Sequence, residues 1–310
     1  MTSPARTTFV DHMNALLEAA SFESLVSNTP VAGKRDPARF LRNGLAVVGY
    51  SAFETFITDR SSEILTDLNS EKLAFGKLPD KLKEAATLGA VKAISHRASY
   101  EEISARLSFV QRHAQYIAST ATGGYTFSSL TFSPQSTNLT VEDIERFLRA
   151  LVVDAPWTEL TEIARRAGYA TLGFRDHMKQ LLLQRNEAAH TVDADVEITD
   201  LRQMPFDLLA AGLSFDALAS RAVRAITERG AQVDCNAKLQ KLSQMIRIIF
   251  VDEKPGASRR YREYGESSQR ATKVYTEFDI AISEASTRAA SQRSVLVIRD
   301  VAQRPIDWRV

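Results

Sequence analysis

The chain has 310 residues, of which 44% are hydrophobic and 25% charged, a composition typical of a folded globular protein. Its 39 Lys and Arg residues nearly balance 38 Asp and Glu residues, which excludes a uniformly basic or acidic protein but not a local basic patch. The single cysteine, Cys235, excludes an internal disulfide and a cysteine-based zinc site, so a reducing, cytoplasmic setting is expected. Residues 1–10 carry no signal-peptide pattern, and no apolar stretch approaches the roughly 20 residues of a membrane helix.

The spacing of apolar residues predicts helices from about residue 5 to residue 230. Apolar residues recur three and four positions apart in residues 8–25 and along a broad face of residues 40–68, which Asp36 and Pro37 precede as a helix start. Ser99 and Thr140 each open a capping-box pattern. Further helices are expected at 157–167, 172–193 and 199–228.

Residues 121–140 interrupt this pattern. They are rich in Ser, Thr and Gly, and they include Tyr125, Phe127 and Phe132, so a long loop with at most a short hairpin is expected. Its aromatic side chains either stack on nucleic-acid bases or cover the edge of a core.

A second pattern follows Cys235. Strands are expected at 245–251, 259–264, 294–299 and 305–310, with an amphipathic helix at 276–291. Residues 236–310 hold 14 Lys and Arg against 9 Asp and Glu, a net charge of +5, whereas residues 1–235 have a net charge of −4. The fold class is therefore mainly α: a helical bundle over residues 1–230, followed by a small basic α+β (ββαββ) domain over residues 236–310.

Several catalytic motifs are missing from the sequence. It contains no HExxH, no phosphate-binding P-loop and no GxSxG, so nothing supports a metalloprotease, a P-loop nucleotide hydrolase or an α/β-hydrolase. We expect neither a metal nor a cofactor.

One cluster of polar residues lies near the end of the predicted helix 172–193. On a helix, Arg185 continues the apolar face of Phe174 and Met178, where a charged group needs a partner or a function. Asn186 and His190 are four residues apart and share one flank.

These residue types suit metal-free RNA cleavage, in which the ribose 2′-OH attacks the adjacent phosphate. Imidazole can move protons near neutral pH, and a fixed guanidinium can stabilise the charge of the phosphorane. One histidine does not easily serve as both acid and base, but a symmetric partner chain could supply the second.

The run from Arg185 to His190 resembles the Arg-x(4–6)-His motif of the HEPN superfamily, in which a polar residue often follows the Arg. Residues 49–56 are similar to the early core helix of its RiboL-PSP-type branch, and the resemblance extends over residues 36–228. It implies an all-α domain that dimerises around a composite, metal-independent endoribonuclease site and acts as a toxin or in defence against phage. An antitoxin or another regulatory protein is the implied partner besides RNA.

On this resemblance, Arg185 stabilises the phosphate, His190 is the acid or base, and Asn186 orients the site. Glu54 either pairs with Arg185 or lies exposed on its helix. Val192 stands where members modified by nucleotidyltransferase antitoxins carry Tyr, which argues against that form of regulation.

Two other Arg–His spacings fit the loose motif. Arg6 precedes His12 in an N-terminus expected to fray, and Arg106 precedes His113 but is followed by an apolar residue. His113 and His177 are expected on the surface.

The basic tail offers a weaker RNA-binding candidate. Arg259, Arg260 and Arg262 alternate with Tyr261 and Tyr264, so they either track a phosphate backbone or form a charged edge strand. Alternatives to a nuclease are a non-catalytic RNA-binding or regulatory HEPN-like protein and a purely structural dimerisation module.

Overall fold

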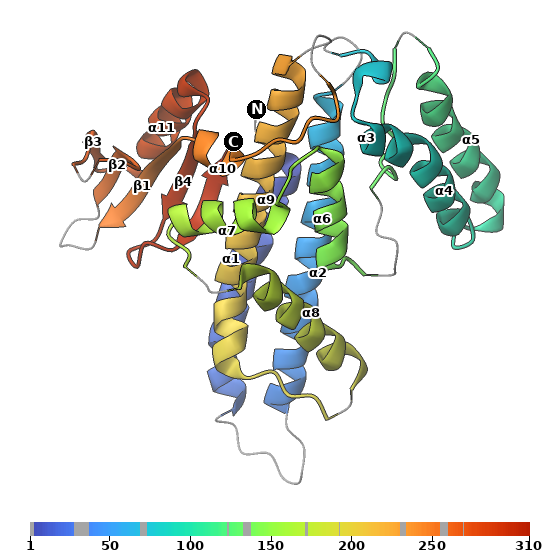
Figure 1. The fold of residues 1–310 in the computed structure, drawn as a ribbon. Coiled ribbons are helices and arrows are strands. Elements are labelled where there is room, and N and C mark those ends of the chain that lie inside the picture. The colour runs from blue at the N-terminus through green and yellow to red at the C-terminus, as the bar shows by residue number, and fades with distance from the viewer. Residues whose placement is uncertain are drawn as a thin grey trace. The chain divides into compact units, whose positions relative to one another are not determined.

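A computed structural model describes residues 3–27, 37–68, 73–122, 124–132, 138–170, 173–191, 193–229, 234–254, 260–268 and 270–310 (Figure 1). The chain divides into two compact units. Unit 1 comprises Met1–Phe56, Leu160–Ala217 and Ser243–Val310, and unit 2 comprises Ile57–Glu159 and Leu218–Leu242.

Unit 1 is built on a bundle of long helices. These are α1 (Pro4–Ser27), the first part of α2 (Pro37–Thr66), most of α7 (Pro156–Arg166), α8 (Phe174–His190) and the first part of α9 (Ile198–Arg229). Residues 204–217 of α9 are all buried, as expected for a helix surrounded by other elements.

An aromatic cluster forms the centre of this bundle. The Phe56 ring lies 4.6 Å from Phe9 and 5.9 Å from Trp308, measured between ring centroids. Gly212 of α9 allows this approach, because a Cβ there would lie only 2.8 Å from the Phe9 ring.

A five-stranded sheet completes unit 1. Its strands are β1 (Ile248–Lys254), β2 (Arg260–Gly265), β3 (Lys273–Tyr275), β4 (Val295–Arg299) and β5 (Pro305–Arg309), in the order β3-β2-β1-β4-β5. β1 and β4 are parallel and the other neighbours are antiparallel. The short helix α10 (Leu242–Met245) precedes the sheet, and α11 (Phe278–Gln292) lies between β3 and β4 and buries its alanines against one sheet face.

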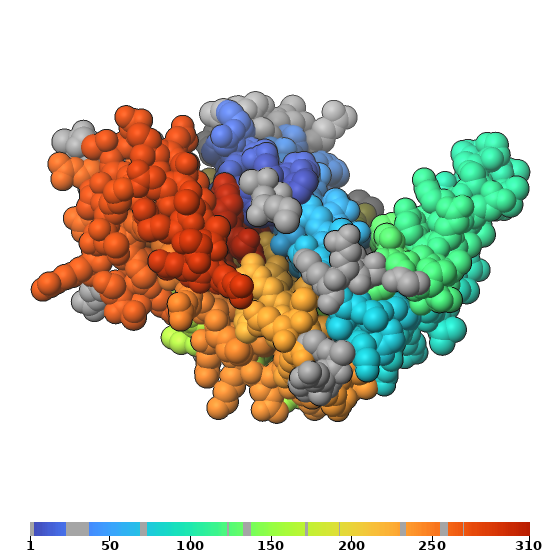
Figure 2. Space-filling view, turned by 90° about the horizontal axis from the view of Figure 1, so that it is seen from above, coloured from blue at the N-terminus to red at the C-terminus, as the bar shows by residue number. Residues whose placement is uncertain are grey.

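The other face of the sheet packs on the helices through its last strand. Trp308 is fully buried, and its indole Nε1 donates to the buried carboxylate of Asp216 on α9 at 2.8 Å. Asp307 forms an ion pair with Arg6 of α1. Figure 2 shows the end of the chain, in red, against α1, in blue.

Unit 2 holds the shorter helices. They are η1 (Phe75–Lys77), α3 (Asp80–Glu84), the π-helical turn η2 (Ala85–Gly89), α4 (Ala90–Ala98), α5 (Ile103–Ser119) and α6 (Val141–Ala150). The described parts of residues 121–140 form the predicted loop and contain no hairpin. Tyr125 in this loop is buried and donates its hydroxyl to the Leu68 carbonyl.

The predicted fold class is confirmed, with three differences in detail. Thr140 and Asp143 form the predicted capping box, but Ser99 does not cap α5: it ends α4, and its hydroxyl bonds to the His96 carbonyl. No bounds were predicted for the helices between residues 75 and 98, where the π-helical turn η2 interrupts the regular period. The three-residue strand β3 was not predicted, because it is too short to show a period. Among the described residues, no helix is long and apolar enough to cross a membrane.

Candidate functional site

Helix α8 positions the Arg185 motif. Phe174, Met178 and Leu181 form its buried face, and Arg185 continues that face toward the C-terminal end of the helix. The amphipathic spacing of α8 thus places the Arg185 guanidinium in a mostly buried position, where its positive charge needs a polar or acidic partner.

Arg185 lies against two polar partners. Its side chain is 12% exposed; Nη1 donates to Asn186 Oδ1 at 3.0 Å, and Nη2 lies 3.8 Å from Glu54 Oε2 on α2. The buried Nε has no hydrogen-bond partner among the described residues. A cation held only loosely by a carboxylate keeps donors for an incoming anion.

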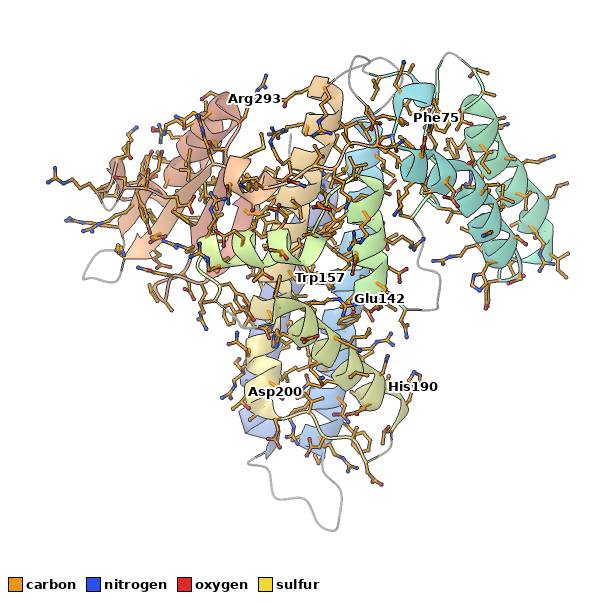
Figure 3. All side chains as sticks on the ribbon, in the orientation of Figure 1. Phe75, Glu142, Trp157, His190, Asp200 and Arg293 are labelled. Carbon is orange, nitrogen blue, oxygen red and sulfur yellow. The ribbon has the colours of Figure 1, made fainter. Side chains whose placement is uncertain are left out.

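His190 is the last residue of α8 and is exposed (Figure 3). It lies five positions after Arg185, so the two side chains leave the helix roughly 140° apart. The structure therefore brings Arg185, Asn186 and Glu54 together and places His190 on the outer flank of the same helix.

The segment after His190 is fixed to α2. Asn43 donates to the Ala194 carbonyl at 2.7 Å and accepts from the Val196 amide at 3.1 Å. Arg42 adds an ion pair with Asp195 at 2.5 Å. These bonds hold the end of α8, and with it His190, beside the N-terminal half of α2. Val192 lies outside the described residues.

The other two Arg–His spacings have structural roles. Arg6 does not lie in a frayed terminus, because α1 begins at Pro4 and Arg6 is buried in its ion pair with Asp307. Arg106 is exposed and donates to backbone carbonyls. The prediction that His113 lies on the surface was wrong: it is buried and bonds to Ser128 at 2.9 Å, and burial lowers its pKa.

A second network was not predicted. His177 is partly exposed, and its Nε2 lies 2.8 Å from Oδ2 of the buried Asp207. Asp207 also accepts from Tyr169 at 2.6 Å and Gln203 at 2.8 Å. The hydrogen bond to Asp207 raises the pKa of His177. A carboxylate inside an apolar helical run was the sequence signal for such a network.

The basic strand β2 is not an edge strand. It lies between β1 and β3 in the sheet. Arg260 and Arg262 are exposed on the face opposite α11, and Lys254 of β1 lies directly across from Arg260 in the antiparallel register. Arg259 lies outside the described residues. Among the described residues, no group of three His, Cys, Asp or Glu side chains is placed to hold a metal ion.

The structure thus shows a helical bundle in which the mostly buried Arg185 is followed by Asn186 and, at the end of the same helix, by the exposed His190. The family model described as RiboL-PSP-HEPN matches residues 14–210, and the chain belongs to that family. Membership implies an RNA-related, nuclease-type function. The match includes α8 with its motif and ends within α9, before the sheet. No curated protein and no solved structure matches the chain.

Proposed function

We propose that the protein is a metal-independent endoribonuclease that cleaves RNA through attack of the 2′-OH. The observation that carries the proposal is Arg185: a nearly buried cation with a loose ion pair and an unsatisfied Nε, in the motif of the family. A phosphate is an anion of the size and geometry that a guanidinium binds.

Each residue then has a chemical task. Arg185 stabilises the charge that develops on the phosphorane, and Asn186, which accepts a hydrogen bond from it, orients the guanidinium. Glu54 supports the same orientation from α2. His190 transfers the proton, for which an exposed imidazole near neutral pH is suited.

The site is completed by a second copy of the chain, which supplies the second histidine. An exposed stripe on α2 supports this dimer: Phe40, Gly44 and Val48 are four residues apart, and Phe40 and Val48 are 63% and 62% exposed.

The stripe begins at Phe40, three residues before Asn43, which holds the segment after His190. The flank of α8 opposite Asn186 and His190 bonds to α9 through His177 and Gln184, so we place the dimer contact on the α2 side. A two-fold axis on this stripe would bring two copies of His190 toward one cleft.

RNA would also contact the sheet. Lys254, Arg260 and Arg262 share the face opposite α11, because β1 and β2 pair Asp252 with Arg262 and Lys254 with Arg260. Three cations on one face can follow a phosphate backbone. Arg259 lies outside the described residues and is kept in the proposal from the sequence alone. Residues 236–310 would then form the basic domain that aids binding.

In the cell, we propose a cytoplasmic toxin or phage-defence effector, controlled by an antitoxin or another regulatory protein. Expression of the wild-type chain should slow bacterial growth, and His190→Ala should relieve that effect. Growth that is equally slow with both chains would contradict this role.

The catalytic proposal is tested by incubating purified protein with RNA in EDTA and identifying the product ends. We expect 2′,3′-cyclic phosphate ends, and losses of at least about 100-fold in rate for Arg185→Ala and His190→Ala. Circular dichroism and light scattering should show an unchanged fold and dimer. His12→Ala, an exposed histidine in another Arg–His spacing, is the matched control and should cleave like the wild type.

Two outcomes would overturn it. Equal cleavage by the wild type and both variants would remove Arg185 and His190 from the mechanism. RNA binding without cleavage by the wild type would favour the alternative, a non-catalytic HEPN-like RNA-binding or regulatory protein.

A further inference from the structure

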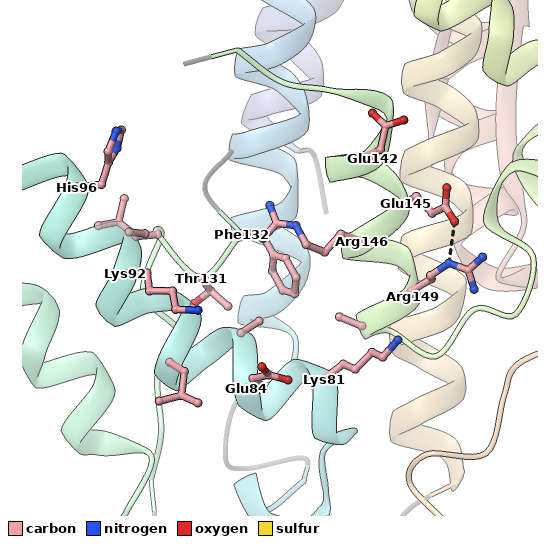
Figure 4. A pocket seen from close by; sticks show the side chains of 16 residues that line it. Lys81, Glu84, Lys92, His96, Thr131, Phe132, Glu142, Glu145, Arg146 and Arg149 are labelled. Carbon is pink, nitrogen blue, oxygen red and sulfur yellow. Dashed lines mark hydrogen bonds and ion pairs between the residues drawn. The ribbon is translucent and has the colours of Figure 1, made fainter. Parts of the chain in front are cut away.

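Unit 2 contains a pocket of about 780 Å³ that no residue of the Arg185 motif lines (Figure 4). Its walls come from α3, η2, α4, residues 130–132 of the loop before α6, and α6 itself. A volume in this range holds a small organic ligand such as a nucleotide.

One part of the wall is apolar and includes an oriented aromatic ring. Phe132 lines the pocket and is held edge-on against Phe147 of α6, with the centroids 4.8 Å apart and the planes at 86°. Leu88 and Leu130 extend this surface. A fixed ring beside apolar side chains is a platform on which a base can stack.

Cations also line the pocket. Arg146 is held at 2.7 Å by Asp143, which is itself fixed by the capping box of α6. Lys81 and Lys92 are exposed, and Figure 4 shows Lys92 and Arg146 on either side of Phe132.

The lining holds three carboxylates against the four cations Lys81, Lys92, Arg146 and Arg149, which leaves a small positive excess. Glu145 is paired with Arg149 at 2.8 Å. Glu142 is exposed on α6, and Glu84 lies between Lys81 and Lys92 in Figure 4. Glu84 can therefore accept a hydrogen bond from a ribose hydroxyl or a base amino group of a ligand that the lysines hold.

The backbone of the pocket is also unusual. Ala85, Leu88 and Gly89 line it from the π-helical turn η2. Such turns are rare and are often found at functional sites, because they displace side chains that a regular helix would align.

We propose that this pocket binds a nucleoside phosphate, with its base on Phe132 and its phosphate on Lys92, Arg146 and Lys81. This site goes beyond the proposed cleavage reaction, since it uses none of that reaction's residues. The same chemistry is offered by a free nucleotide and by one residue of an RNA strand.

Calorimetric titration of the full-length protein tests the proposal. The probes are AMP, GMP, adenosine, inorganic phosphate and a five-residue RNA, the last added to the His190→Ala variant so that cleavage does not interfere. We expect saturable AMP or GMP binding that Lys92→Glu weakens at least tenfold and Phe132→Leu weakens measurably. Lys77→Glu, an exposed lysine outside the pocket, changes the charge equally and should bind within twofold of the wild type.

Comparing the affinities of the mononucleotides and the RNA also distinguishes the source of the ligand. A mononucleotide that binds as tightly as the five-residue RNA indicates a free nucleotide, whereas tighter binding of the RNA, lost in Lys92→Glu, indicates a strand. The proposal is overturned if no nucleotide binds, if Lys92→Glu binds like the wild type, or if Lys77→Glu weakens binding as much. Inorganic phosphate that binds as tightly as AMP would show that the pocket binds anions without recognising a nucleoside, and this result would overturn the proposal as well.

Discussion

At the scale of single residues, three Arg–His spacings that look alike in the sequence have different surroundings. Arg6 is bound by a carboxylate 301 residues away, and Arg106 bonds to carbonyls at the surface. Arg185 is mostly buried, and its Nη2 lies 3.8 Å from Glu54 Oε2, too far for a hydrogen bond. These surroundings, and not the spacing, distinguish Arg185 from the other two arginines and support its proposed role.

His177 gives a pH-dependent prediction at the same scale. Because Asp207 raises its pKa above the ordinary 6.5, the folded state gains stability from the protonated ring below about pH 6.5 and loses it as the pH rises through the raised pKa. His177→Gln should therefore cost up to about 1 kcal/mol of unfolding free energy at pH 5.5, a figure reduced for partial exposure, and less at pH 9. Urea unfolding at both pH values checks this. An equal cost at both would show that the ion pair contributes nothing.

At the scale of elements, the amphipathic pattern predicted that α8 buries one face, but not which helix that face packs against. The structure shows that Asn43 of α2 bonds to the backbone on both sides of Asp195 and so fixes the end of α8 to α2. The proposed catalytic group His190 is positioned by this clamp on a different helix.

The stripe on α2 gives the prediction for this scale. Val48→Asp places a charge in the proposed dimer contact, so it should yield a monomer in light scattering and abolish RNA cleavage. Leu107→Asp changes a residue of similar exposure on α5 and should leave the dimer intact. A Val48→Asp protein that stays dimeric would place the interface elsewhere.

At the scale of the whole molecule, the charge is unevenly distributed along the chain, from −4 in residues 1–235 to +5 in residues 236–310. The separate domain over 236–310 stays a prediction, and the structure shows a core between α11 and the sheet. The second face of that sheet shares Trp308 with the helices, so the two parts of unit 1 stabilise one another.

Trp308→Phe tests that coupling. It removes the donor to buried Asp216 and part of a fully buried ring, so the unfolding free energy should fall by about 2–3 kcal/mol. Val301→Ala, at an exposed position next to β5, should be nearly neutral in the same urea titration. A loss for Trp308→Phe no larger than that of the control would mean that the sheet is stabilised independently of the helices.

The sequence alone determined the helical class, the change to strands after Cys235 and the position of Arg185 on a buried helix face. These follow from local periodicity, which depends only on residues a few positions apart. The tertiary structure decided which residues surround Arg185, that His113 and His177 have buried partners, and that Trp308 belongs to the core of the bundle. Such contacts join residues far apart in the chain, and their geometry is set by how the elements pack against one another.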